Sequence, residues 1–526
     1  MSRFRRRPLV AFVLALACLQ IVPTAVIGDA VNRLAPRVEE VINGPDYRQS
    51  HWGILIVDTK TGEIVFALNA DRMFLPASVT KLFSVAAALG LLGADFRFVT
   101  PVYTRGRLID GRLDGDLILV AVGDVTLGGR TTADGKLAFR NHDHTYANGP
   151  GGVAELTDTD PLAGLKSLAK QVVAAGVRHV AGDVLIDERL FERTQSTGSG
   201  PKAVSPIVVN DNLVDIIVTP GDKAGPPATV RMRPETSYVR MDASVVTVAP
   251  GQPTRLEVRS EGGERFSVRG QIAVKSRPAI RIYGVEDPAA FARALFIETL
   301  RREGVRVTAN PLAPQRGDLP EKDSYGKLRR VAEYTSPPFS EVAKVTLKVS
   351  HNLYASTLPL LVAAKQGKRT LAEGLRLQRQ YLADLGVDVR TISFGGGAGG
   401  AGADQVTPKA TVQLLRALEK RPEYKAFEEA LPVLGVDGTL ADAVGMKSPA
   451  RGMVKAKSGT YYWYDVLNDR MLLTSKALAG TIITARGRRL AFAMFVNNVP
   501  LPRGVTPARE GRVLGQLCEI VHQHAP

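Results

Sequence analysis

Ser78 and Lys81, a serine and a lysine three residues apart, are well placed in this 526-residue chain for covalent chemistry. A serine hydroxyl is a weak nucleophile at neutral pH and needs a base within hydrogen-bond reach. On a helix, residues i and i+3 share one face. The apolar run 82–92 follows directly. We therefore expect a helix that begins near Ser78, with free N–H groups and a dipole that favour the negative charge formed when the serine attacks a carbonyl.

Two further motifs follow in the order that a serine acyl-transferase needs, Ser-His-Asn at 350–352 and Lys-Ser-Gly-Thr at 457–460. Taken alone, Ser78 and Lys81 fit a helix N-cap beside a solvated lysine. Ser-x-Asn occurs once in the chain, and the ordered set of three motifs is far more specific than its parts. The Ser-x-x-Lys spacing by itself is not specific, since it recurs at Ser167/Lys170, Ser199/Lys202 and Ser324/Lys327.

With these motifs the sequence resembles the penicillin-binding proteins and serine β-lactamases, above all the class C low-molecular-mass D-alanyl-D-alanine carboxypeptidase/endopeptidases. In that group a large insertion separates the first two motifs, as the span from Ser78 to Ser350 does here. The resemblance implies an α+β fold, a serine transpeptidase/β-lactamase-like domain in which helices flank an antiparallel sheet, with a large β-rich insertion. Other similar stretches are 115–119, 123–127, 209–212, 352–355 and 434–440.

The chain departs from this family in two places. A glycine-alanine run occupies 395–402, where the family usually has a segment of the Asp-Gly-Ser-Gly-Leu type, and 461–474 lengthens the stretch after Lys-Ser-Gly-Thr. Both lie where a loop would face the substrate. Strand alternation would turn Tyr461 and Trp463 to one face of that stretch and Tyr462 to the other.

The resemblance implies a role for each motif residue. Ser78 would attack the carbonyl of a D-Ala-D-Ala bond and form an acyl-enzyme, while an unprotonated Lys81 accepts its proton. Burial and a second cation, Lys457, would lower the pKa of that lysine. Lys457 would also pair with the carboxylate of the terminal D-Ala, to which Ser458 and Thr460 offer hydroxyls.

The remaining motif residues complete the expected site. Ser350 would relay a proton to the leaving amine, and Asn352 would hold the lysine base and the substrate amide. By resemblance, the oxyanion hole consists of the backbone N–H groups of the nucleophile and of Thr460. Gly459 would let the substrate lie against the strand as an added β partner.

The ends of the chain indicate where this chemistry happens. Four arginines precede the apolar run 9–19, and small residues follow at 26–28. This predicts a secretory signal peptide, 1–28, cleaved after Gly28, with an uncleaved anchor as the alternative. No other run is apolar enough to cross a bilayer. We therefore expect an exported protein of the periplasm or cell envelope.

Composition limits the partners. The formal charge is +16, from 68 basic and 52 acidic residues. The basic residues are scattered without interleaved aromatics, so we expect no nucleic acid, and attraction to an anionic envelope polymer or a carboxylate-bearing substrate instead. Only Cys18 and Cys518 occur, so loss of the signal leaves no internal disulfide. Cys518 lies in the helix-like segment 515–524 and is predicted to be packed.

The pattern of elements predicts a discontinuous catalytic domain, 29–100 and 331–526, interrupted by a β-rich insertion of one or two domains at 101–330. The segment 53–68 reads as a hairpin, 340–364 as a helical stretch, and 453–457, 477–484 and 490–496 as strands. The two outer parts must meet, because Ser78 and Lys457 cannot otherwise share a site.

The histidines offer no rival mechanism. His142 and His144 are interpreted as a solvated loop rather than a zinc site, because no further ligands surround them. His351 is expected on a helix surface or behind the site. No Gly-x-Ser-x-Gly elbow surrounds Ser78, which disfavours a Ser-His-Asp triad. We expect no metal and no cofactor.

The sequence therefore predicts a serine D-alanyl-D-alanine carboxypeptidase/endopeptidase that acts on peptidoglycan peptides, with β-lactams as covalent inhibitors. A serine β-lactamase is one alternative, against which the large insertion argues. A non-enzymatic cell-wall-binding protein with a decayed site is the other, against which the complete motif set argues.

Overall fold

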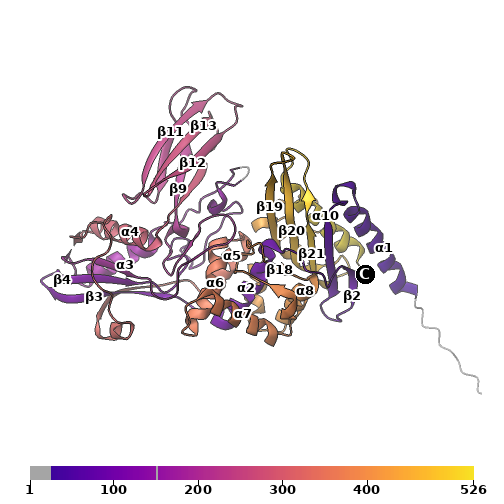
Figure 1. Cartoon of the computed structure of the whole chain (residues 1–526), viewed down its shortest axis with the longest axis horizontal. Helices are drawn as coiled ribbons and strands as arrows, with labels where there is room; N and C mark the ends of the chain where they lie inside the picture. Colours follow the sequence, from indigo (N-terminus) through magenta and orange to yellow (C-terminus); the bar gives the residue numbers. More distant parts are fainter. Residues whose placement is uncertain (1–24, 150–151, 526) are drawn as a thin grey trace, which may run out of the picture.

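The computed structural model describes residues 25–149 and 152–525 (Figure 1). Residues 1–24 of the predicted signal peptide lie outside this range. Within it, no helix combines the length and the apolar character that a membrane crossing requires.

A six-stranded antiparallel sheet joins the two ends of the chain, in the order β19-β20-β21-β1-β2 with β22 beside β20. Ile54 on β1 lies opposite Met494 on β21, so segments more than 400 residues apart are hydrogen-bonded neighbours. The predicted hairpin 53–68 is present, and its turn closes through Gly62 N–H to Asp58 O. The strands are β1 (His51–Asp58), β2 (Ile64–Leu68), β19 (Val454–Asp465), β20 (Arg470–Ile483), β21 (Arg489–Asn497) and β22 (Val499–Pro500).

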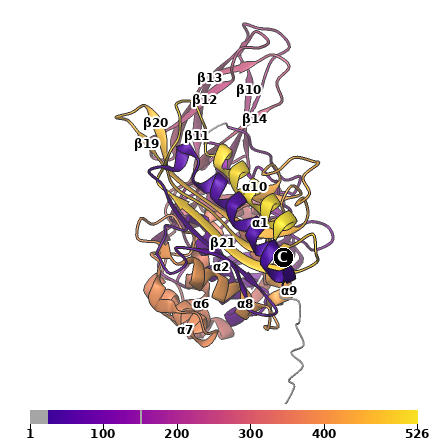
Figure 2. The ribbon, with the colours of Figure 1, turned by 90° about the vertical axis from the view of Figure 1, so that its right-hand side faces the viewer.

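Helices cover both faces of this sheet. Successive side chains of a strand point to opposite faces, and apolar residues at consecutive positions make both faces apolar. Ile54 and Ile56 pack against α1 (Ala25–Ile42) and α10 (Ala508–His524), which lie side by side in Figure 2. Cys518 on α10 is buried as predicted, and burial raises the pKa of its thiol to about 12.

Leu55 and Val57 face the opposite way, toward a second group of helices. At its centre, α2 is almost wholly buried, which explains its apolar sequence. The predicted helical stretch 340–364 is instead two helices, because Ser350 adopts a left-handed φ of 62° between α5 and α6. This group comprises α2 (Thr80–Leu92), α5 (Phe339–Lys348), α6 (Asn352–Lys365), α7 (Leu371–Asp384), α8 (Pro408–Leu418) and α9 (Tyr424–Ala430).

The insertion is built on three sheets around one core. A mixed sheet, β15-β5-β4-β3-β16 with β6, packs on α3 (Ala163–Ala174) and α4 (Pro288–Arg302). Its strands are β3 (Val99–Ile109), β4 (Arg112–Val120), β5 (His179–Val180), β6 (Val184–Asp187), β15 (Arg306–Val307) and β16 (Arg329–Thr335). The expected domain limits at 100/101 and 330/331 therefore fall within β3 and β16.

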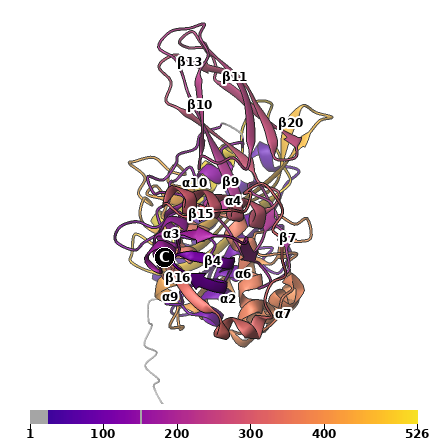
Figure 3. The same ribbon diagram turned by 90° about the vertical axis from the view of Figure 1, so that its left-hand side faces the viewer.

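Two three-stranded sheets, β10-β9-β14 and β11-β13-β12, complete the insertion, and the second projects from the body (Figures 1 and 3). The strands of these two sheets are β9 (Leu213–Thr219), β10 (Thr229–Arg233), β11 (Arg240–Val248), β12 (Arg255–Gly262), β13 (Arg265–Ala273) and β14 (Ala279–Gly284).

Short elements connect these layers. Two small ladders pair β7 (Thr194–Gln195) with β8 (Ala203–Val204) and β17 (Ile392–Ser393) with β18 (Gln405–Val406). The 3-10 turns are η1 (Pro45–Tyr47), η2 (Ala77–Val79), η3 (His144–Tyr146), η4 (Asn210–Asn212), η5 (Lys322–Lys327), η6 (Val389–Thr391) and η7 (Gly438–Leu440).

The contact between α6 and α7 provides a test of the packing. At Gly374 on α7, a Cβ atom would lie 2.0 Å from the backbone oxygen of Pro359 on α6. Although alanine is the better helix former, we expect Gly374→Ala to lower the free energy of unfolding by about 1–3 kcal/mol through overpacking. Denaturant unfolding followed by circular dichroism measures this change.

Gly511→Ala on α10 is the matched control, because the nearest atom to its added Cβ lies at an ordinary 3.5 Å. There the better helix propensity should stabilise the protein by about 0.5–1 kcal/mol. Equal changes at the two positions would contradict the close α6–α7 contact.

Candidate active site

Ser78 lies in η2, directly before α2, as the sequence predicts for a helix that begins near it. Ala77 has a left-handed φ of 46°, a conformation that costs free energy for a residue with a Cβ atom. Lys81 Nζ lies 2.8 Å from Ser78 Oγ, and the lysine side chain is fully buried. The structure therefore brings together the serine and the base that the first motif predicts.

The surroundings of Lys81 favour its neutral form. Its Nζ donates hydrogen bonds of 2.7 Å to Asn352 Oδ1 and to the backbone oxygen of Ala398. Burial, followed by the charge of Lys457, holds the pKa of Lys81 well below its ordinary value, with Asp404 opposing. A neutral amine has two N–H bonds and one lone pair. When Asn352 and Ala398 accept the N–H groups, the lone pair faces the Ser78 hydroxyl and can accept its proton.

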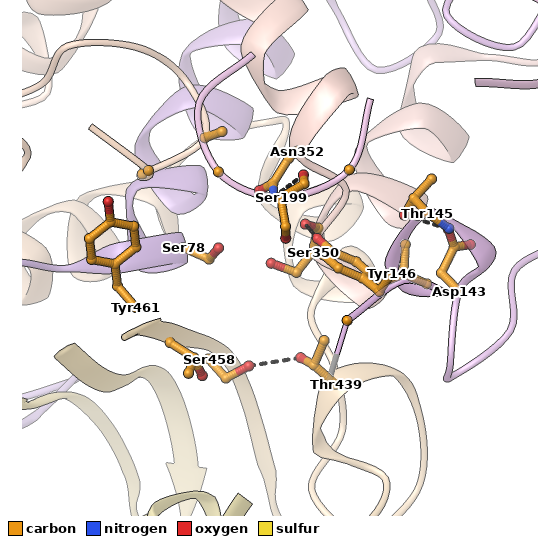
Figure 4. A pocket seen from close by; sticks show the side chains of 18 of the residues that line it. Ser78, Asp143, Thr145, Tyr146, Ser199, Ser350, Asn352, Thr439, Ser458 and Tyr461 are labelled. Atoms are coloured by element: carbon orange, nitrogen blue, oxygen red, sulfur yellow. Dashed lines mark hydrogen bonds between the residues drawn. The ribbon is translucent and has the colours of Figure 1, made fainter. Parts of the chain in front are cut away.

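In the second motif, Ser350 lies in the break between α5 and α6 and Asn352 begins α6, and both line the same cleft as Ser78 (Figure 4). The insertion holds this motif from the other side. The hydroxyl of Tyr146 donates to the backbone oxygen of Ser350, and Asn352 Nδ2 donates to Ser199 O at 2.9 Å. The sequence predicts that the side-chain amide of Asn352 contacts the substrate. In the structure its NH2 group binds a loop of the insertion.

The third motif occupies β19, the edge strand of the main sheet, next to the Ser78 turn. Lys457 is fully buried and does not line the cleft; its Nζ donates to Ser458 O at 2.6 Å. Burial and the charge of Lys476 lower the pKa of Lys457 to about 7. Ser458 and Thr460 do line the cleft, and Ser458 Oγ donates to Thr439 Oγ1 at 2.9 Å (Figure 4).

Gly459 has a packing role in addition to the substrate contact expected of it. A Cβ atom there would lie 2.5 Å from Pro76 O and 3.2 Å from Ser78 N. The missing side chain therefore lets β19 approach the turn that carries the nucleophile. As a result, the backbone N–H groups of two motifs come close to one another.

The glycine-alanine run 395–402 is a packing junction. Its shape is fixed by Asp404, whose carboxylate accepts hydrogen bonds from Gly395 N–H at 2.8 Å and Ala401 N–H at 2.9 Å. Three of its glycines lie against backbone from three other parts of the chain, too close for a side chain. A Cβ atom at Gly397 would lie 1.9 Å from Ala355 O, and one at Gly399 would lie 1.9 Å from Ala77 O. At Gly400, it would lie 2.3 Å from Gly198 N.

These segments enclose a cleft of ≈ 1570 Å³ that reaches from Ser78 into the insertion. Its walls include Tyr146 and Ser199 of the insertion and Lys476 of β20. Both Tyr461 and Tyr462 line it, which simple strand alternation does not allow, because the β19–β20 register shifts between Tyr461 and Trp463.

Reasoning from sequence missed four residues of this site: Thr439, Tyr146, Ser199 and Lys476. Thr439 lies in the family-like stretch 434–440, so that resemblance contained a signal for it. Ser199 has only the unspecific Ser-x-x-Lys spacing, and Tyr146 and Lys476 have no local pattern, since these residues reach the site only through the tertiary fold.

The solvated position expected for His144 is wrong, and the helix-surface position expected for His351 is excluded. His144 is buried, not solvated, and it lies 2.6 Å from Asp215 Oδ1 and 2.7 Å from Asp211 Oδ2. Although burial opposes it, Asp215 with its neighbours raises the pKa of His144 to about 10. His351 is also fully buried and caps α6, where its Nδ1 accepts from Tyr354 N–H. Within the described ranges, no group of three or more His, Cys, Asp or Glu residues is arranged to hold a metal ion.

Comparisons with known proteins agree with this geometry. A D-alanyl-D-alanine carboxypeptidase of an Actinomadura species is 28% identical over 95% of this chain and 87% of its own length. The carboxypeptidase DacB of Haemophilus influenzae is 25% identical, covering 85% of each chain. The crystal structure of penicillin binding protein 4 from Haemophilus influenzae has a TM-score of 0.67 at 21% identity, over 94% of this chain and 99% of that one.

These relatives do not favour the β-lactamase or the non-enzymatic alternative. The family model described as D-Ala-D-Ala carboxypeptidase 3 (S13) matches residues 34–512. Because that match runs through nearly the whole sequence, the chain belongs to the D-Ala-D-Ala carboxypeptidase 3 family.

Proposed function

We propose that this serine carboxypeptidase cleaves the D-Ala-D-Ala bond of peptidoglycan peptides through an acyl-enzyme on Ser78. The observation that carries the proposal is the 2.8 Å contact between Ser78 Oγ and the buried amine of Lys81. A buried amine that is neutral at working pH is the base that a serine nucleophile needs.

The reaction proceeds in two steps. Ser78 Oγ attacks the carbonyl carbon of the penultimate D-Ala while its proton passes to Lys81, and the backbone N–H groups of Ser78 and Thr460 stabilise the oxyanion. The C–N bond then breaks, and the proton on Lys81 passes through the Ser350 hydroxyl to the departing amine of the terminal D-Ala, which leaves Lys81 neutral again. Water, deprotonated by the same base, hydrolyses the ester and restores the Ser78 hydroxyl.

Two residues of the third motif bind substrate in this proposal. The hydroxyls of Ser458 and Thr460, which line the cleft, hydrogen-bond the carboxylate of the terminal D-Ala. Lys457, behind the cleft wall, keeps Lys81 neutral by charge repulsion. The edge of β19 offers backbone groups to an extended peptide.

The setting is part of the proposal. Residues 1–28 act as a signal peptide, and the mature protein works in the periplasm or cell envelope, where its basic surface favours peripheral association with anionic envelope polymers. The catalytic domain is discontinuous, and its limits are best drawn outside β3 and β16 so that the mixed sheet stays whole. Cross-linked peptides are included as endopeptidase substrates, because the insertion leaves a long cleft beyond Ser78.

Ser78→Ala should abolish covalent labelling by a fluorescent penicillin and lower the release of D-Ala from a D-Ala-D-Ala peptide by several orders of magnitude. The reason is that, among the described residues, the hydroxyl hydrogen-bonded to the buried amine of Lys81 is that of Ser78. Gel fluorescence and a D-alanine assay measure the two effects.

Ser199→Ala is the control, because this serine also lines the cleft and has a lysine three residues later. Label that persists in Ser78→Ala, or that is mapped by mass spectrometry to Ser199, would refute the assignment. Rapid release of label from the parent protein would indicate a β-lactamase.

The charge state of Lys81 gives a pH prediction. The charge of Lys457 lowers the pKa of Lys81, so Lys457→Met should raise that pKa. Since only neutral Lys81 accepts a proton, the acid limb of the acylation profile should move to higher pH, and acylation at pH 7 should slow. Stopped-flow acylation across pH measures the shift.

Lys455→Met removes a charge from the same strand as a control, because Lys455 is partly exposed and pairs with Glu428 at 3.1 Å. We expect its acid limb to coincide with that of the parent protein. An unmoved acid limb in Lys457→Met would show that Lys457 does not tune the base.

The glycine run gives a further prediction. Gly400→Ala would push the 395–402 loop from Gly198, displacing both the Asn352 contact and the Ala398 oxygen, so acylation should slow by about 10- to 100-fold. Gly402→Ala, where the added Cβ meets nothing within 4 Å, should acylate like the parent. Equal acylation rates for the two folded variants would show that the packing of the 395–402 loop does not affect catalysis.

A further inference from the structure

Lys476 is a buried cation that faces the cleft. It lies on β20 directly across from Thr460 on β19, and its Nζ donates to Thr460 Oγ1 at 2.8 Å. The residue is only 8% exposed, yet it lines the cleft. Its single polar contact with the described chain is therefore to a neutral hydroxyl at the substrate-facing strand.

No carboxylate of the described residues pairs with this ammonium group within 4 Å. Glu510, which acts on it electrostatically, is already engaged, since it accepts hydrogen bonds of 2.6 Å from Tyr47 and from Arg509. A buried charge without a counter-ion is costly, so buried cations are normally paired. An anion bound in the cleft would supply the missing partner.

The other cations of the region do not fit this position. Arg193 lines the cleft but pairs with Glu188 and Asp287. Lys202 is exposed and donates to Gly198 O. Lys457, to which sequence reasoning gives the carboxylate, is shut behind the cleft wall.

We propose that Lys476, together with the Thr460 hydroxyl, binds the carboxylate of the terminal D-Ala and makes the release of that residue depend on its free carboxylate. This inference rests on the proposed function, because it assumes a scissile carbonyl at Ser78. One residue lies beyond that carbonyl, which is about 3.3–3.6 Å of extended chain. The carboxylate then reaches the stretch of β19 where Thr460 and its cross-strand partner Lys476 lie side by side.

The charge state of Lys476 suits this role. Burial lowers the pKa of its ammonium group to about 8, against the opposing charge of Glu510. The lysine therefore keeps its proton at neutral pH. Its incomplete solvation leaves it ready to exchange water for a carboxylate.

The test compares a peptide ending in free D-Ala-D-Ala with the same peptide ending in the C-terminal amide. We expect the purified protein to prefer the acid, and Lys476→Met to lower kcat/KM for the acid by about 10- to 100-fold while causing no loss for the amide. Lys476→Arg, which retains the charge, should keep most of the preference. Lys455→Met serves as the control for loss of a charge near the sheet.

Three results would overturn the proposal: a parent protein without preference for the acid, a Lys476→Met variant that keeps the preference, or equal losses for acid and amide. Equal losses would mean that Lys476 only supports the fold. If Lys476→Met does not fold, Lys476→Gln provides the same comparison with a polar side chain.

Failure of the proposed function is distinguishable. The parent protein could release no D-Ala and still be acylated by benzylpenicillin. In that case the test compares the acylation rates of benzylpenicillin and of its methyl ester, in place of the acid and amide peptides. Lys476→Met should then slow only the reaction of the free acid. A protein that neither turns over peptide nor reacts with penicillin would refute both proposals.

Discussion

The structure of this carboxypeptidase depends on keeping the amine of Lys81 out of water. A charged ammonium in that position would need a carboxylate, and its two hydrogen-bond acceptors beyond Ser78 are neutral oxygens, from Asn352 and Ala398. Those acceptors come from α6 and from the glycine run, which are far from Ser78 in sequence. A functional base therefore requires three distant segments to pack against one another, and the main sheet, joined by β1 and β21, brings them together.

The insertion takes part in this arrangement. Tyr146 and Ser199 hold the two outer residues of the second motif, and Asp211 joins the insertion to α6 through the hydroxyl of Tyr354. Asp211 also pairs with Arg130 at 2.7 Å in a buried network. Buried ion pairs contribute little net stability, but they cost a great deal when one partner is lost, so they fix geometry. The insertion thus positions Ser350 and Asn352 against the catalytic helix.

The sequence predicts the parts of this site that are local and misses those that are not. The helix after Ser78, the hairpin 53–68 and the three strands of the second half follow from spacing and apolar periodicity. The break at Ser350 does not, because helical residues continue on both sides and only the left-handed φ interrupts them. Likewise, the glycine run looks like a flexible loop, whereas its glycines are required by backbone contacts with segments that no sequence pattern connects. The burial of His144 escapes the sequence for the same reason, since the aspartates that pair with it lie about 70 residues away.

The three lysines of the site form an electrostatic series along the sheet. Lys476 lowers the pKa of Lys457, and Lys457 lowers the pKa of Lys81. Burial increases along the same path, from 8% exposure at Lys476 to none at the other two. Neighbouring lysines in a poorly solvated region cannot all be charged at once, so the proton is favoured on Lys476, the lysine nearest the cleft. The carboxylate that we propose to bind at Lys476 would neutralise the outer charge and let Lys457 keep its proton, and a charged Lys457 would in turn hold Lys81 neutral when substrate is present.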